Sequence, residues 1–147
     1  EYSDAIQFRY LKKDDVTMIF AFDMLIYNVD RNHRKPNLLF DGGEFYLIDH
    51  EGAFASDPPS FMHTPFILKS HLLSKKAKKL SRQPNKNAFA AFEFYLNNLN
   101  LLKLHKTLNQ IELSGLEVGK ARKWLKYIEE QKRNSAKFLN LLTDYLK

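Results

Sequence analysis

The first third of the chain carries apolar residues at steps of three and four, the period of a helix with one buried face. The apolar positions are Met18, Phe22, Leu25, Ile26 and Val29. They predict a helix over residues 15–29, with Asp14 or Asp15 as the N-cap. We expect this helix to deliver Asn28 and Asp30 to its C-terminal end, before Pro36 prevents a simple continuation.

Two short apolar runs follow, at residues 38–40 and 45–48, and the sequence Asp41-Gly42-Gly43-Glu44 separates them. Glycines between such runs provide the positive φ angles that a tight hairpin turn requires. The pattern therefore predicts a small β-hairpin in which Asn37 opens the first strand and Asp49 closes the second.

Helical patterns dominate the rest of the chain, after a segment with three prolines between residues 57 and 65. The predicted helices cover residues 66–80, 87–99, 101–108 and 117–146. In the last of them, residues 131–134 interrupt the apolar spacing and predict either a break or an exposed middle turn. The fold class expected is mainly α with a small β-hairpin, in a single domain over residues 1–147.

Composition supports a folded protein that works in a reducing compartment. The 147 residues are 44% hydrophobic and 14% aromatic, enough to bury a core. The absence of cysteine excludes disulfides and thiolate zinc sites. We find no apolar run of about 18 residues and no signal-peptide pattern, so we expect a soluble, cytoplasmic protein. The sequence starts at Glu1, which suggests a piece of a longer polypeptide.

Charge is unevenly distributed along a chain whose net charge is +6. Residues 1–57 hold six Lys/Arg and eleven Asp/Glu, whereas residues 69–86 hold seven Lys/Arg and no acid. The basic tract could meet nucleic acid, an anionic membrane or an acidic protein. It could equally be a solvated helix face.

The segment 28–51 places Asp30 in a charged loop, Asn37 at the start of a strand and Asp49 at the end of the next strand. Phosphoryl transfer needs one carboxylate to orient the acceptor hydroxyl, and an amide oxygen with a second carboxylate to hold Mg²⁺. An aspartate after the apolar run 45–48 would be costly at a buried strand end unless it bound a metal or donors. Asn32 is a competing amide, but it does not lead into the hairpin.

These residues carry a resemblance to a known family. The pieces are Asn28, Asp30-Arg31, Arg34-Lys35, Pro36-Asn37-Leu38-Leu39 and Leu47-Ile48-Asp49-His50. Together they resemble the catalytic loop and metal motif of the HipA-like kinases, which are relatives of protein and lipid kinases. The step from Asp30 to Asn37 is seven residues, against five in ordinary protein kinases.

The resemblance implies a fold and a set of roles. The chain would be the C-terminal lobe of a kinase-like fold, with the catalytic loop and metal motif at residues 28–51 and a helical part at 66–147. Asp30 would be the catalytic base, and Asn37 and Asp49 would bind Mg²⁺. The other implied site residues are Arg31, Arg34 and Lys35 as phosphate or nucleotide contacts, and Asn28 and His50 as supporting residues.

The function implied is ATP- and Mg²⁺-dependent phosphorylation of a protein serine or threonine hydroxyl. No Gly-rich phosphate loop precedes residue 42, so an N-terminal lobe would come from the same or another polypeptide. One alternative is a lipid or small-molecule kinase. Another is a non-catalytic kinase-like module that binds nucleic acid or an acidic partner through the basic tract at residues 69–86.

Overall fold

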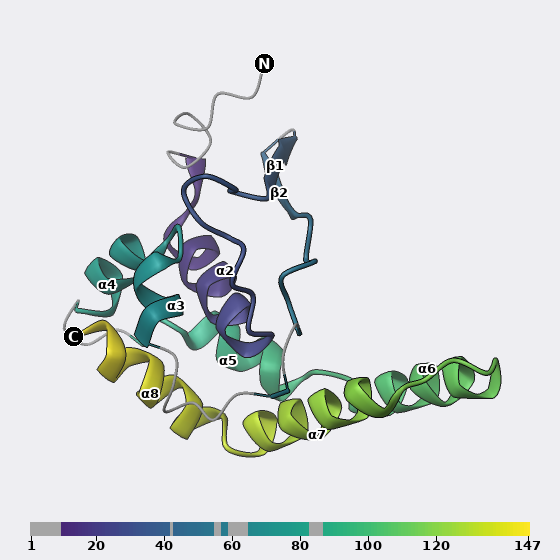
Figure 1. The fold of residues 1–147 in the computed structure, drawn as a ribbon. Helices are drawn as coiled ribbons and strands as arrows, with labels where there is room; N and C mark the ends of the chain where they lie inside the picture. The colour runs from purple at the N-terminus through teal and green to yellow at the C-terminus, as the bar shows by residue number, and fades with distance from the viewer. Residues whose placement is uncertain (1–9, 42, 55–56, 59–64, 83–86) are drawn as a thin grey trace.

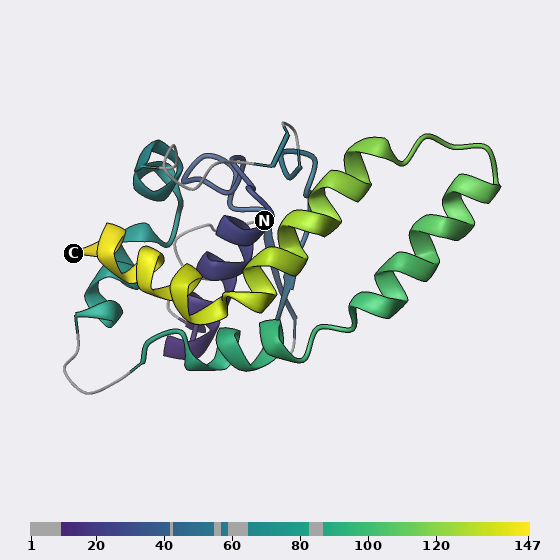
Figure 2. The same ribbon diagram turned by 90° about the horizontal axis from the view of Figure 1, so that it is seen from below.

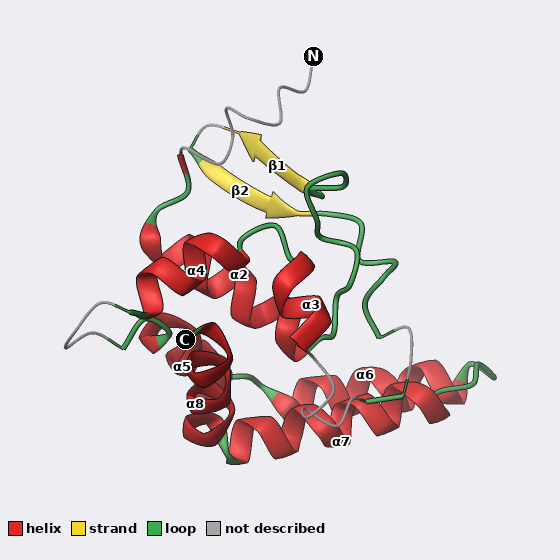
Figure 3. Ribbon diagram, turned by 60° about the vertical axis from the view of Figure 1, so that its left-hand side comes forward, coloured by secondary structure: helices red, strands yellow, loops and turns green. Residues whose placement is uncertain are grey.

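The computed structural model describes residues 10–41, 43–54, 57–58, 65–82 and 87–147, and these residues form seven helices and one two-stranded sheet (Figure 3). The elements are α2 (Lys13–Leu25), β1 (Leu38–Asp41), β2 (Glu44–Leu47), α3 (Pro65–Ser70), α4 (Ser74–Ser81), α5 (Ala90–Asn97), α6 (Leu101–Leu113), α7 (Gly119–Arg133) and α8 (Ser135–Leu146). The predicted composition of the fold, mainly α with a hairpin, is confirmed.

Helix α2 is the centre of the body, with α4 and α5 packed against it (Figure 1). Its N-cap is Lys12, whose backbone N–H donates to Asp15 Oδ2 at 2.8 Å, so the predicted N-cap at Asp14 or Asp15 is wrong. The helix also ends earlier than predicted, because Tyr27 has a φ of +55° and leaves the helical path. Asn28 and Asp30 consequently lie in the irregular segment that follows α2.

The predicted hairpin is confirmed, but β1 begins after Asn37 and β2 ends at Leu47, two residues before Asp49. β1 and β2 pair antiparallel, with Leu38 opposite Leu47 and Asp41 opposite Glu44. Gly43 in the turn has a φ of +100°, which explains the need for glycine there. Gly42, the other turn glycine, lies outside the described residues.

The predicted helix over residues 66–80 is instead two helices, α3 and α4. The chain breaks at His71, and two backbone N–H groups leave the helical pattern there. Leu72 N–H donates to the carbonyl of Arg31 at 3.0 Å, and Leu73 N–H donates to His71 Nδ1 at 3.1 Å. Tertiary contacts to the loop after α2 therefore override the local helical periodicity.

The C-terminal half contains the remaining helices. α5 lies within the predicted helix over residues 87–99 and buries Phe92 and Leu96. α6 is longer than the predicted 101–108, and Asn100 Oδ1 caps it by accepting from the N–H of Lys103 at 3.0 Å. The predicted break in the last helical stretch is confirmed at Asn134, between α7 and α8.

The C-terminal arm shares one of its two helices, α7, with the core. Buried side chains of α2, α4, α5, α7 and α8 form one cluster. Helices α6 and α7 run antiparallel beside each other and project from the body as an arm (Figures 1 and 2). None of the described helices combines the length and the apolar character needed to cross a membrane.

Candidate active site

A buried carboxylate, Asp23, fixes the start of the loop that contains Asp30. Arg31 Nε lies 2.5 Å from Asp23 Oδ2, and both side chains are fully buried. Asn28 Nδ2 donates to Asp23 Oδ1 at 3.0 Å, and His71 Nε2 lies 2.9 Å from Oδ2. Every buried charge in this cluster has a partner, as a buried ion pair requires.

The hydrogen bonds also define the state of His71. Its Nδ1 accepts from the N–H of Leu73, so the proton is on Nε2, which donates to Asp23. Burial would raise the pKa of Asp23, but the hydrogen bonds from His71 and Arg31 and the guanidinium charge outweigh it, so this pKa lies below its ordinary value. Asp23 is therefore a carboxylate at neutral pH.

Asp30 is held from two sides. Its backbone N–H donates to Asn28 Oδ1 at 3.2 Å, which ties the loop to the Asp23 cluster. From the other side Gly52 approaches so closely that a Cβ there would lie 2.7 Å from the Cβ of Asp30. Only glycine fits this close approach, so Gly52 is part of the framework that places Asp30.

The open end of the hairpin brings Asn37 and Asp49 together. Ile48 N–H donates to the carbonyl of Asn37 at 3.1 Å, which extends the strand pairing by one step. Asn37 Nδ2 then donates to the carbonyl of Asp49 at 3.3 Å. Both residues have left-handed backbones, with φ of +49° and +50°, a conformation that Asn and Asp tolerate better than most residues.

Lys35 connects the loop to the hairpin end. Its Nζ lies 3.2 Å from Asp30 Oδ2. The hydrogen bond and charge of Asp30 raise the pKa of Lys35, and the charges of Asp49 and Glu51 raise it further. Of these three carboxylates, only that of Asp30 is in direct contact with the Lys35 ammonium.

Other predicted site residues have different environments. Arg31 is buried and donates to Asp23 and to the carbonyls of Pro36 and Asn37, a placement that does not fit the expected phosphate contact. It is a positioning residue for the loop. Arg34 is exposed, and its backbone N–H donates to Asn32 Oδ1.

His50 and Asn32 have structural contacts. His50 Nε2 lies 3.4 Å from Arg31 Nη2, and the His50 ring stands edge-on to Phe22. Asn32 accepts from two loop N–H groups and donates to the carbonyl of Asp30, so its amide orders the loop. This use of Asn32 leaves Asn37 as the amide beside Asp49.

The strand-end argument for Asp49 is wrong, because Ile48 and Asp49 are both exposed rather than buried. Exposure removes the cost of burial on which that argument depended. Asp49 is exposed, whereas Asp30 and Asn37 are half-buried, and none of the three lines the large cavity of about 820 Å³ between α2, the hairpin and α5.

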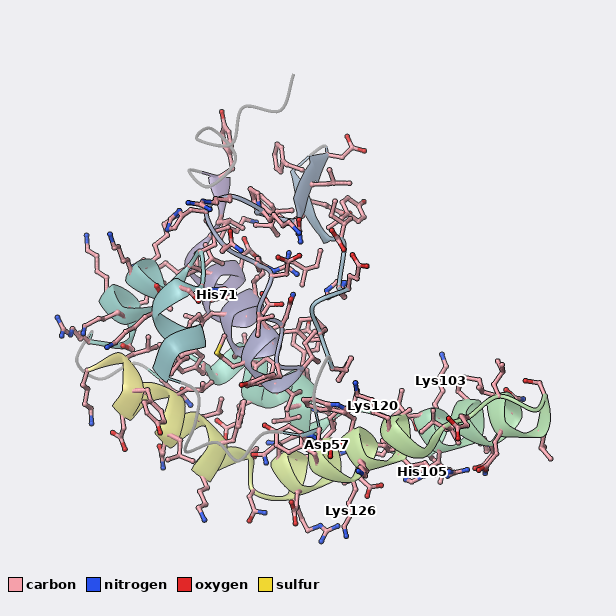
Figure 4. All side chains as sticks on the ribbon, viewed as in Figure 1. Asp57, His71, Lys103, His105, Lys120 and Lys126 are labelled. Carbon is pink, nitrogen blue, oxygen red and sulfur yellow. The ribbon has the colours of Figure 1, made fainter. Side chains whose placement is uncertain are left out.

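Sequence reasoning missed three residues that shape the site, namely Asp23, His71 and Gly52. A signal existed for the first, because an acid within the apolar run of residues 19–26 is unusual. His71 had no such signal, because its partner Asp23 is 48 residues away. Figure 4 shows His71 at the turn between α3 and α4, directed toward α2.

Asn37 and Asp49 are the candidate ligands for a magnesium ion. Among the described residues, no group of three or more His, Asp or Glu side chains is placed to hold a metal ion. Mg²⁺, however, commonly takes one or two protein oxygens and completes its shell with phosphate and water. A carboxylate such as that of Asp49 and an amide oxygen such as that of Asn37 are ligand types that Mg²⁺ accepts.

The basic tract is only partly described, because residues 83–86 lie outside the described residues. Within α4, Lys75, Lys76 and Lys79 are exposed. Arg82 Nη2 donates to the carbonyl of Lys147, so one cation of the tract ties α4 to the C-terminal residue. The exposed lysines fit the solvated-face interpretation as well as the binding one.

Comparison with known proteins gives one match. No curated protein and no solved structure shows significant similarity to the chain. The sequence model of the HipA-like kinase family matches residues 3–109, which include α2, the loop with Asp30 and the whole hairpin. Since this match covers most of the chain and all of the site described above, the protein belongs to the HipA-like kinase family.

Proposed function

We propose that the chain is the C-terminal lobe of a kinase-like fold and provides the catalytic loop and metal ligands of an ATP- and Mg²⁺-dependent phosphotransferase. Its acceptor is a serine or threonine hydroxyl of a protein. The observation that carries the proposal is the set of hydrogen bonds that joins the loop to the hairpin end: Arg31 Nη1 donates to the carbonyl of Asn37, and Asn37 Nδ2 donates to the carbonyl of Asp49. Asp30 directly precedes Arg31, so these contacts support a common site for Asp30, Asn37 and Asp49.

Asp30 is the group that receives the acceptor hydroxyl. Its carboxylate orients the hydroxyl and takes its proton as the new oxygen–phosphorus bond forms and the bond from the γ-phosphorus to the bridging oxygen breaks, which releases ADP. Asn28 and Gly52 hold the Asp30 backbone, which supports this role because phosphoryl transfer depends mainly on positioning.

Asn37 and Asp49 would hold Mg²⁺, which supplies neutralisation of phosphate charge when bound. The hydrogen bond from Asn37 Nδ2 to the Asp49 carbonyl supports this assignment, because it fixes the amide beside the carboxylate-bearing residue. Lys35 stays charged at neutral pH and would contact a nucleotide phosphate, with Arg34 as a second, exposed cation.

Asp49 is exposed and none of the three site residues lines the cavity between α2, the hairpin and α5, so a nucleotide needs more enclosure than these residues give. We therefore propose that an N-terminal lobe, in the same or another polypeptide, covers the nucleotide. Transfer should then require both parts, whereas the present chain alone binds Mg²⁺–nucleotide weakly.

The test compares Asp30→Asn and Asp49→Asn with the unchanged protein, using transfer of labelled γ-phosphate by the complete protein to protein, lipid and small-molecule acceptors. Each variant should lower transfer by roughly 10²–10⁴-fold. Asparagine tolerates the left-handed backbone of residue 49, so a loss cannot be attributed to strain. Asp41→Asn, an exposed hairpin carboxylate, is the matched control and should retain full transfer.

Retained turnover in both variants would end the proposal. Labelling of lipid or a small molecule in place of protein would change the acceptor only. An absence of Mg²⁺-dependent nucleotide binding, together with nucleic-acid affinity that falls steeply with salt, would instead support the basic binding module.

A further inference from the structure

A continuous apolar groove runs from the candidate active site to the α6–α7 arm. One section, of about 360 Å³, lies between α2, α5 and α6 and includes His50, Phe54 and Leu104. A second section, of about 420 Å³, lies between α6 and α7 over Trp124 and Leu125. Phe54, Leu104 and Ile128 line both sections, so they form one groove.

The groove is an incompletely covered apolar surface. The side chains that line its first section are aliphatic or aromatic, and only His50 and the hydroxyl-bearing Tyr95 have polar side-chain atoms. None of the thirteen residues of α6, every one of which the structure describes, is buried. Leu104 remains 36% exposed within the groove. Contiguous exposed apolar surface of this kind commonly marks a protein-binding site.

The position of the groove relates it to phosphoryl transfer. His50, at one end, directly follows Asp49, the proposed metal ligand. Phe54 is tied to the end of α2 by a hydrogen bond from its N–H to the carbonyl of Ile26 at 3.1 Å. A polypeptide lying in the groove would therefore reach the face that carries Asp30 and Asp49.

Charge indicates the chemistry of the occupant. Residues 101–133, which form the arm, contain eight Lys/Arg and four Asp/Glu. Lys120 and Glu117 both lie on the wall of the second section, so the excess of positive charge comes from the arm around the groove. Figure 4 shows Lys103 and Lys120 on the side of the arm that faces the body, and Lys126 on the opposite side. A second copy of this arm would bring like charges together, whereas an acidic segment would be complementary.

We propose that this groove binds an acidic, amphipathic segment of the protein substrate, next to the hydroxyl that is phosphorylated. The proposal rests on the function proposed above and specifies its substrate class. Apolar side chains on one face of the segment occupy the groove, and acidic side chains on its flanks lie against the arm. This is the helix-in-groove mode, in which apolar anchors give affinity and charge gives selectivity.

The test uses the full chain and a labelled peptide of about 18 residues, with leucines at i, i+4 and i+7 and glutamates at the flanking positions. Leu104→Glu should weaken peptide binding by about tenfold or more, because it places a charge in an apolar groove. Leu102→Glu is the matched control, since Leu102 lies on the same helix, is 68% exposed and does not line either section. Leu102→Glu should leave the affinity for the peptide unchanged.

The charge part of the proposal has its own pair of variants. Lys120→Glu should weaken binding of the acidic peptide severalfold and make it less salt-dependent, whereas Lys106→Glu, exposed on α6 outside the groove, should have a smaller effect. A peptide with lysines in place of glutamates should bind far more weakly than the acidic one.

Three results would overturn the proposal. The first two are equal affinity for the acidic and basic peptides, and equal peptide affinity of Leu104→Glu and Leu102→Glu. The third is dimerisation that Leu104→Glu abolishes, which would make a second copy of the chain the occupant. Asp30→Asn should still bind the peptide. A variant that loses phosphate transfer but still binds the peptide gives information on catalysis only. A variant that keeps phosphate transfer but no longer binds the peptide contradicts only the proposed docking groove.

Discussion

The loop after α2 and the α6–α7 arm use charged residues in opposite ways. Around the loop, Asp23, Arg31 and His71 are buried. Asp23 forms hydrogen bonds with both Arg31 and His71, which come from two other segments of the chain. In the arm, the ion pairs are at the surface. Arg122 pairs with Glu112, and His105 Nε2 lies 2.5 Å from Glu129 Oε1, with all four side chains partly exposed.

This difference indicates what each region needs. A buried pair contributes little net stability compared with apolar packing, but removing one partner is costly, so it fixes a single geometry. Exposed pairs contribute little either way and leave the surface adaptable. The catalytic loop is thus held in one arrangement, whereas the arm presents a basic apolar surface to a partner.

The strongest test of this contrast removes one cation from each region. Arg31→Met leaves Asp23 buried without its main partner and should lower the free energy of unfolding by about 3–5 kcal/mol. Arg122→Met is the control and should cost less than about 1 kcal/mol, because Arg122 and Glu112 are 38% and 55% exposed. Urea unfolding of both variants measures the two losses of unfolding free energy. Similar losses would contradict the contrast between the loop and the arm.

The second test is the pH dependence of stability. The pKa of Asp23 is lower in the folded chain than its ordinary value of 3.8, so the unfolded chain binds its proton more readily. The stabilisation is present above that value and is lost as the pH falls through the folded pKa. The urea midpoint should therefore fall as the solution is made acidic. The corresponding loss of unfolding free energy should be smaller than the loss caused by Arg31→Met.

Asp23→Asn should flatten this acid slope, since it removes the group that titrates. Asp144→Asn alters an exposed carboxylate that pairs with Lys147, and should leave the slope nearly unchanged. An identical slope in all three proteins would show that the buried cluster is not the source of the acid sensitivity.

A third test concerns the close approach of Gly52 to Asp30. Gly52→Ala would place a Cβ 2.7 Å from the Asp30 Cβ, and the shift needed to relieve the clash should cost about 1–3 kcal/mol and reduce phosphate transfer. Gly119→Ala, where a Cβ would meet nothing within 4 Å, should be neutral or stabilising by about 0.5 kcal/mol. Unfolding and transfer measured together separate strain from catalysis.

Local pattern predicted much of the fold. The hairpin, α5 and the break at Asn134 follow from apolar spacing and turn residues, which act over a few positions. The split between α3 and α4 could not be predicted, because it depends on Leu72 donating to Arg31 and on His71 reaching Asp23. Such contacts join residues about 40 or more positions apart, and no periodicity records them.

The site shows the same limit. The sequence predicted Asp30, Asn37 and Asp49 from their types and order, and the structure brings their segments to one face; their catalytic roles stay predictions. The sequence did not reveal that Arg31 turns inward, because an arginine in a charged loop is usually at the surface. Its burial depends on Asp23, which sequence reasoning assigned to the apolar helix without a role.

The smallest expected effect concerns the arm itself. His105→Gln removes a short contact to Glu129 that joins α6 to α7, yet the side chains are 43% and 25% exposed, so the loss should be only about 0.2–1 kcal/mol. Urea unfolding measures this loss. A loss above about 2 kcal/mol would mean that the arm, like the loop, depends on one specific polar contact for its stability, which contradicts the contrast between the two regions.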